Sequence, residues 1–171
     1  MWSKRGRMPV RAMRRRPRER PQGTPTPLPP ALRQTLNAAV ERLIPSEPGS
    51  PGAREARVEA YFEQALSEDL HDVAATYAFN LELLEHHARS FYERPFPELQ
   101  PTDQDALLTR LEANELAGFE PDSASFFRTL LRHTVEGMFG DPSRGGNHRF
   151  AGWDLISAES PASKPVLIIS S

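Results

Sequence analysis

The stretch TVEGMFGDPSRGGN at residues 134–147, followed by a Gly-Trp pair at residues 152–153, decides where the last long helix of this chain ends. An apolar helical pattern runs into a segment that cannot continue a helix. Pro142 disfavours the helical conformation of Asp141, so we expect the helix to stop near Gly140.

The residues after this stop suit unusual backbone angles. Gly145 and Gly146 allow backbone angles that are closed to other residues, and Asn147 tolerates such angles better than most. The pattern predicts a loop of defined shape beside Trp153. On local chemistry alone, a tight turn with Trp153 packed as its lid is favoured over a catalytic loop.

Apolar residues recur at helical spacing along the rest of the chain, and no alternating pattern is long enough for a sheet. We therefore predict an all-α fold, an irregular bundle of about five helices joined by Pro- and Gly-rich loops. The first helix is expected over residues 30–44 and the third over residues 69–92. The second is expected to begin at Pro51 or Ala53. Thr102 is the expected N-cap of the fourth helix, and Asp122 or Ser123 that of the fifth.

The ends of the chain differ from its middle. We expect a disordered basic and Pro-rich arm at residues 1–30, a helical domain at 31–157 and a tail at 158–171. The run Val166–Ile169 in the tail is the one β-like segment, either a frayed end or a strand added to a partner.

Composition narrows the function classes. The chain has 171 residues and no Cys, which excludes disulfides, thiolate metal ligands and cysteine nucleophiles. The net charge of -2 conceals an asymmetry, because residues 1–20 hold nine basic residues and one acidic residue. The remaining residues hold twelve basic and twenty-two acidic side chains, so a basic arm of +8 precedes a body of -10.

The arm contains three consecutive arginines at residues 14–16, which raises the question of a twin-arginine export signal. A signal needs about 7–15 apolar residues after the basic region, and Leu28 is the only large apolar residue between Pro17 and Pro30. Three explanations stay open. The protein remains in the cytoplasm, reaches the periplasm with a partner that carries the signal, or starts elsewhere, with Met8 and Met13 as other possible starts.

An arginine-rich arm also binds nucleic acid through phosphate contacts in some proteins. This arm has no aromatic residues interleaved for base stacking. Its composition favours a solvated arm over a nucleic-acid-binding one.

No constellation of residues forms a candidate active site. One Glu-x-x-His motif occurs at residues 68–71, whereas a di-iron bundle needs two. Glu136 follows His133 by one helical turn, which permits a local surface pair. A nucleophile elbow, a phosphate-binding loop and a dinucleotide fingerprint are absent from the sequence, as is any apolar run long enough for a transmembrane helix.

Two motifs carry a family resemblance. The sequences GDPSRGGN at residues 140–147 and GW at 152–153 resemble the end of the gluconate 2-dehydrogenase subunit 3 family, and LIP at 43–45 with PGA at 51–53 resembles an early signature of that family. The two blocks bracket residues 31–156. The end departs from the family pattern, because Asp154-Leu155-Ile156-Ser157-Ala158 replaces a Leu-Ile-Gly-Tyr-Pro-like sequence.

The resemblance implies a role for the chain. Members are small accessory subunits of flavin-dependent sugar or polyol dehydrogenases, whose large subunit is of the glucose-methanol-choline type. It implies that FAD is bound by that large partner, that a cytochrome subunit often accepts the electrons, and that this chain has no catalytic residue, cofactor or metal of its own.

We therefore predict an interface with the large subunit at the shaped loop and a weaker second contact at the loop from Pro45 to Pro51. The primary candidates are Phe139, Asp141, Pro142, Gly145, Gly146, Asn147 and Trp153. The alternative is a stand-alone helical binding protein whose basic arm contacts nucleic acid or an acidic surface. An independent metal enzyme is a weaker third hypothesis.

Overall fold

The computed structural model describes residues 28–159 except residue 69, and this part of the chain is all-α as predicted. It contains no strand; a single antiparallel bridge joins Glu47 and Ser50. The α-helices are α1 (Pro30–Leu43), α2 (Val58–Ser67), α3 (Ala74–Tyr92), α4 (Pro101–Glu112), α5 (Ser123–Phe139) and α6 (Ala151–Glu159). Short 3-10 helices are η1 (His71–Val73), η2 (Phe96–Glu98), η3 (Pro142–Arg144) and η4 (His148–Phe150).

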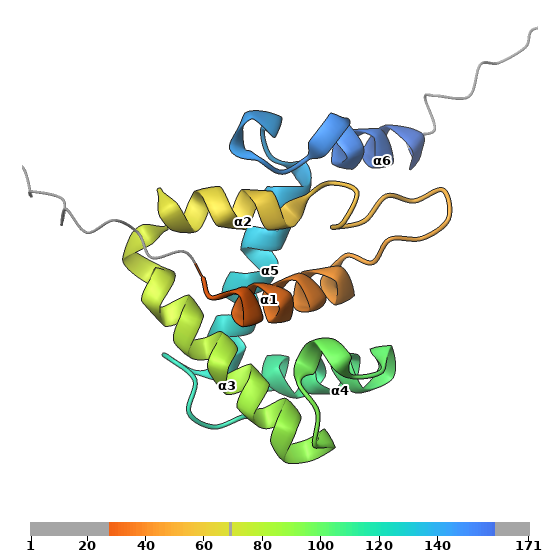
Figure 1. The fold of residues 1–171 in the computed structure, drawn as a ribbon. Helices are drawn as coiled ribbons and strands as arrows, with labels where there is room; N and C mark the ends of the chain where they lie inside the picture. The colour runs from red at the N-terminus through yellow and green to blue at the C-terminus, as the bar shows by residue number, and fades with distance from the viewer. Residues whose placement is uncertain (1–27, 69, 160–171) are drawn as a thin grey trace, which may run out of the picture.

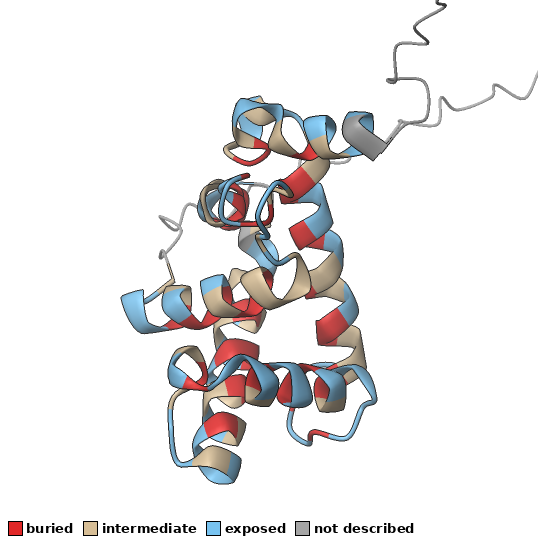
Figure 2. Cartoon of the chain, turned by 90° about the vertical axis from the view of Figure 1, so that its right-hand side faces the viewer, coloured by how far each residue is buried: buried red, intermediate tan, exposed pale blue. Residues whose placement is uncertain are grey.

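Helix α5 runs through the middle of the bundle and contacts α1, α2, α4 and α6 (Figure 1). Helix α4 lies near the amino end of α5, and α6 lies near its carboxyl end. Helices α1 and α2 cross α5 between these two ends. Buried residues line the inward faces of the helices (Figure 2). The largest fully buried apolar side chains are Phe62, Phe96, Leu36, Leu81, Leu84, Leu107, Leu111, Leu130 and Met138.

Both predicted ends of the last long helix are confirmed. Helix α5 ends at Phe139 with Gly140 as its C-cap, and Asp122 is its N-cap, because the Asp122 carboxylate accepts a 2.8 Å hydrogen bond from the Ser125 backbone N–H. The predicted cap of α4 at Thr102 is wrong. The helix already begins at Pro101, whose fixed φ suits the first helical position and whose missing N–H leaves no donor unsatisfied there.

Two other boundaries differ from the prediction. Residues 53–57 form turns rather than helix, and α2 begins at Val58 because Arg57 adopts a left-handed conformation with φ 54°. The third helix was expected from residue 69, but α3 begins at Ala74 after the separate turn η1. The backbone N–H of Leu70 bonds to the carbonyl of Ala65 at 2.7 Å, which turns the chain between α2 and η1.

Helix α6 is not among the predicted helices; its residues, 151–159, span the end of the expected helical domain and the start of the expected tail. The β-like run at 166–169 and the arm up to residue 27 lie outside the described residues. Within them, Leu28 is partly buried and packs against the hydrophobic core.

Candidate partner interface at the carboxyl end of α5

Asn147 fastens the shaped loop to the end of α5. Its backbone N–H donates to the Gly137 carbonyl at 2.7 Å, and its side-chain amide donates to the Gly140 carbonyl at 2.8 Å. Its side-chain oxygen accepts from the Gly152 backbone N–H at 2.9 Å. Asn147 is 0% exposed and has φ 46°. The predicted left-handed conformation is present, and the residue satisfies helix-end carbonyls that would otherwise lack a partner.

Glycines permit the loop to lie directly on the helices. Gly145 has φ +91°, and a Cβ built on it would come within 2.9 Å of the Ala60 carbonyl oxygen in α2. A Cβ on Gly146 would overlap the Gly137 carbonyl oxygen, and one on Gly152 would overlap that of Met138. The loop therefore requires glycine because its backbone packs against other backbone.

Trp153 completes this arrangement in α6. Its indole Nε1–H donates a 2.8 Å hydrogen bond to the Phe139 carbonyl, and its ring stacks on Phe150 with centroids 5.2 Å apart. The side chain is nevertheless 45% exposed. Trp153 is thus both a lid on the helix end and part of the surface.

Asp141 and Pro142 shape the start of the loop. Pro142 is the first residue of η3, and the Asp141 carboxylate accepts a 2.9 Å hydrogen bond from the Ser143 backbone N–H. This bond lowers the pKa of Asp141 below its ordinary value. Asp141 is exposed and Pro142 and Phe139 are half-buried, so these three residues border the surface.

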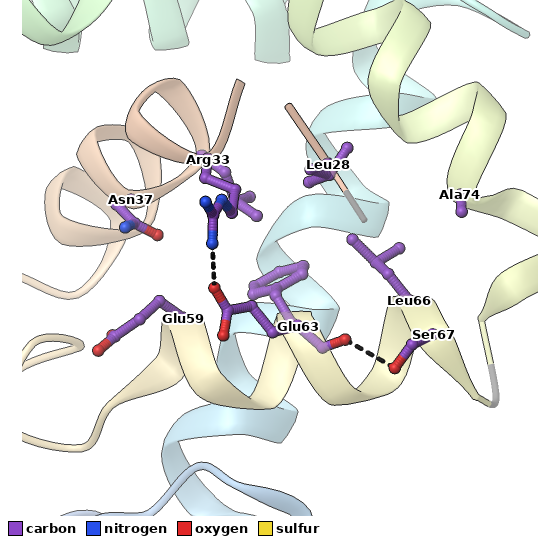
Figure 3. A pocket seen from close by; sticks show the side chains of 10 residues that line it. Leu28, Arg33, Asn37, Glu59, Glu63, Leu66, Ser67 and Ala74 are labelled. Atoms are coloured by element: carbon purple, nitrogen blue, oxygen red, sulfur yellow. Dashed lines mark hydrogen bonds and ion pairs between the residues drawn. The ribbon is translucent and has the colours of Figure 1, made fainter. Parts of the chain in front are cut away.

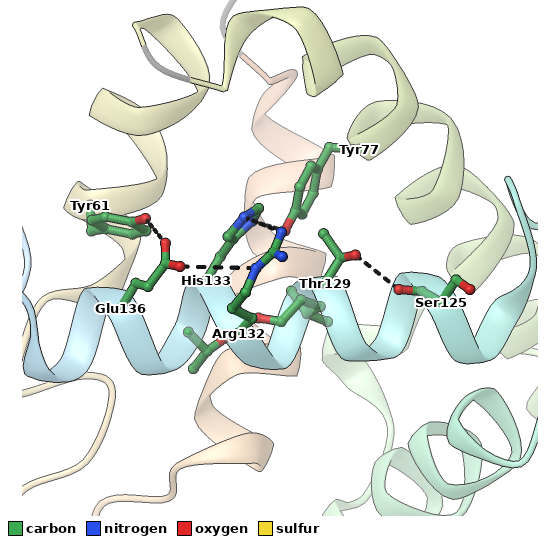
Figure 4. Close-up of polar contacts among 9 residues, drawn as sticks. Tyr61, Tyr77, Ser125, Thr129, Arg132, His133 and Glu136 are labelled. Carbon is green, nitrogen blue, oxygen red and sulfur yellow. Dashed lines mark hydrogen bonds and ion pairs between the residues drawn. The ribbon is translucent and has the colours of Figure 1, made fainter.

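A polar network that is buried at Tyr77 and His133 and reaches the surface at Glu136 links α2, α3 and α5 (Figure 4). The Tyr77 hydroxyl and His133 Nδ1 are 2.6 Å apart, and the Tyr61 hydroxyl donates to the Glu136 carboxylate at 2.7 Å. Burial lowers the pKa of His133. Burial, together with the Glu136 hydrogen bond, raises the pKa of Tyr61 to about 12.

The expected surface pairing of His133 with Glu136 was wrong. His133 is only 3% exposed and bonds across to Tyr77 in α3, while Glu136 bonds to Tyr61 in α2. Helical spacing allows either arrangement, and a histidine in sequence gives no sign of whether its face is buried. Sequence reasoning therefore missed the network as a whole.

A groove of about 350 Å³ lies between α1 and α2 (Figure 3). Apolar residues that include Leu28, Leu36 and Phe62 line it, and a 2.9 Å ion pair joins Arg33 of α1 to Glu63 of α2 across it. Its residues were not among the predicted site residues.

The second predicted contact, the loop from Pro45 to Pro51, is a short turn closed by two backbone hydrogen bonds between Glu47 and Ser50. Pro45 is exposed and lines a hollow of about 530 Å³ together with residues of α1 and α4. Pro51 is half-buried. The structure thus places Pro45 at a hollow different from the surface around Trp153.

Comparison with known protein families identifies the family of this chain. A family described as gluconate 2-dehydrogenase subunit 3 matches residues 30–159. The chain belongs to this family. No curated protein and no solved structure matches it. The matched range runs from the first residue of α1 to the last residue of α6, so the family domain includes the helix that sequence analysis missed.

The described residues contain no group of three or more His, Asp or Glu side chains placed to hold a metal ion. Of the helices in the same part of the chain, none is long and apolar enough to cross a membrane.

The predicted interface residues thus fall into two groups. Gly146 and Asn147 are buried and fasten the loop internally, as does the tightly packed Gly145. Trp153 and Asp141 are exposed. A partner would touch the surface that the first group builds, and the assignment of this surface as an interface stays a prediction.

Proposed function

We propose that this chain is a non-catalytic accessory subunit that binds a flavin-dependent sugar or alcohol dehydrogenase of the glucose-methanol-choline type and stabilises it or helps its assembly. The family match across the entire helical body carries this proposal, because the family is named as one subunit of a dehydrogenase. On this proposal FAD is bound by the large subunit, and a cytochrome subunit takes the electrons.

The use of the polar residues supports an accessory role. Side chains of types that occur in acid–base catalysis are used here for contacts between helices: Tyr77 pairs with His133, and Tyr61 pairs with Glu136. Asn147, in the most distinctive motif, caps a helix. These groups stabilise a rigid body that presents Trp153 and its neighbours to the outside, which is the arrangement expected of a docking subunit.

The test is purification of the tagged chain from its native cells, followed by mass spectrometry and an absorption spectrum. We expect a larger partner of the glucose-methanol-choline type with a flavin spectrum. A colourless preparation rich in nucleic acid, from which the nucleic acid is lost when residues 1–27 are removed, would overturn the proposal. It would instead support the stand-alone protein that acts through its basic arm.

A further inference from the structure

We infer that the outer face of η4 and α6, together with Arg57, is the surface that docks on the large subunit, and that the partner surface combines an apolar hollow with carboxylates at its edge. The inference rests on the proposed function and adds to it the location and chemistry of the contact. Phe150, Trp153 and Ile156 form its apolar part, which we call the aromatic patch. Arg57 and Arg149 form its basic edge.

The aromatic patch is exposed and already ordered. Phe150 is 50%, Trp153 45% and Ile156 58% exposed, although each is large and apolar. The stacked rings of Phe150 and Trp153 restrain each other, and the bond from Trp153 to the Phe139 carbonyl anchors the pair to α5. Exposed aromatic side chains held in one conformation lose little entropy on binding, which is typical of the anchor residues of interfaces.

The basic edge lies beside this patch in a body that is otherwise acidic. Arg57 and Arg149 are both exposed. Arg149 directly precedes Phe150, and Arg57 follows Ala56, whose carbonyl accepts a 3.0 Å hydrogen bond from the His148 backbone N–H. Neither arginine forms an ion pair or side-chain hydrogen bond with the described residues. Two unpaired cations beside an apolar patch favour a partner surface that carries carboxylates.

The backbone gives an independent sign that these side chains matter. Of the six non-glycine residues with positive φ in the described chain, four lie here: Arg57 at 54°, Asn147 at 46°, Arg149 at 55° and Phe150 at 62°. Internal hydrogen bonds account for Asn147. Arg149 and Phe150 are exposed, and glycine would adopt their conformation with less strain. Strain kept at exposed residues is characteristic of functional surfaces.

A protein partner fits this surface better than other occupants. The family name places the chain in a complex, and a stacked aromatic pair with a neighbouring aliphatic side chain matches the anchor residues of protein interfaces. An anionic membrane would also meet apolar and basic groups, so membrane binding is included below as a contrary outcome.

The test uses the large subunit that co-purifies with the full-length chain, with binding measured by titration. One variant carries Phe150→Ser and Ile156→Ser, and a second carries Arg57→Glu and Arg149→Glu. Phe79→Ser is the matched control for the first, since Phe79 is an exposed aromatic residue on α3. Arg94→Glu, on the exposed turn after α3, is the control for the second. Circular dichroism establishes that each variant is folded.

We expect the aromatic-patch variant and the basic-edge variant each to bind at least tenfold more weakly than the unaltered chain. Both controls should bind within twofold of it. The effect of the charge reversal should shrink as salt is added, because exposed charges are screened. If the aromatic-patch and basic-edge variants bind the flavoprotein like the unaltered chain, the inference is overturned and the proposed function still stands. If these two variants lose only their binding to phosphatidylserine vesicles, the inference is likewise overturned. An unaltered chain that binds no flavoprotein would overturn both.

Discussion

Replacing Asn147 by Asp tests whether this residue fastens the loop to α5. The substitution keeps the size of the side chain and the oxygen that accepts from the Gly152 N–H. It removes the amide that donates to the Gly140 carbonyl at 2.8 Å and places a carboxylate against that carbonyl instead. The change therefore removes one partly buried hydrogen bond, introduces one charge, and alters little else.

The expected cost follows from these contacts. Removing the donor leaves the partly buried Gly140 carbonyl without a partner, which costs about 1–3 kcal/mol, and the carboxylate placed against it adds to this cost. We expect the free energy of unfolding to fall by about 3 kcal/mol at pH 7.5, which a domain of ordinary stability survives. Asn37→Asp is the control, because Asn37 is exposed on α1, and it should change stability by no more than about 0.5 kcal/mol.

The loss should depend on pH. Burial against a carbonyl raises the pKa of the introduced carboxyl above its unfolded value of about 3.9. Its destabilising effect is therefore complete at neutral pH and declines as the pH falls through the raised folded-state pKa, since the protonated acid can again donate to the Gly140 carbonyl.

Urea unfolding followed by circular dichroism at pH 7.5 and pH 5, on the variant and the unaltered chain, gives this difference directly. A loss below about 1 kcal/mol, or a loss that is the same at both pH values, would refute the role assigned to Asn147.

Three further predictions concern the stability of the fold. Burial lowers the pKa of His133, so the free energy of unfolding should begin to fall as the pH drops below about 6.5, and His133→Gln should reduce this dependence in denaturant titrations. Gly146→Ala should cost about 1–3 kcal/mol because its Cβ would overlap the Gly137 carbonyl, whereas Gly49→Ala, with open space around it, should cost about 1 kcal/mol or less in the same unfolding assay. Asp122→Ala should cost about 1 kcal/mol through loss of the α5 cap; a melting temperature equal to that of the unaltered chain would contradict this.

The sequence was sufficient to predict the helices whose ends are set by local chemistry. Pro142 and Gly140 stop α5 through their own backbone preferences, and Asp122 caps it with its own side chain. These effects act within a few residues, so they can be read without knowing the rest of the fold.

Boundaries set by distant contacts could not be predicted in this way. Residues 53–57 form turns in place of the expected first turns of α2, and the left-handed Arg57 sets the helix start at Val58. Within this segment, the Ala56 carbonyl accepts from the His148 N–H almost a hundred residues later, a contact that no local pattern reveals. Helix α6 is nine residues long, too short for a clear periodic signal.

The candidate site was predicted in outline only. The special backbone angles of Gly145 and Asn147 were expected from residue type, and both are present. Which side chains face outward depends on how the loop packs on α5, so Phe150 and Ile156 were missed although they are among the most exposed large apolar residues described. Arg149 was missed because nothing in sequence marks an arginine as left-handed.

On our proposal, this chain supports a flavin-dependent dehydrogenase without performing the chemistry. The decisive experiment expresses the large flavoprotein that co-purifies with it, alone and together with this chain, and compares soluble flavin-loaded enzyme and sugar-oxidising activity. We predict that co-expression raises both in proportion, so that activity per bound flavin stays nearly constant. Equal yields of loaded enzyme with and without the chain would contradict the accessory role, and an activity per flavin that depends on this chain would show that it takes part in the reaction.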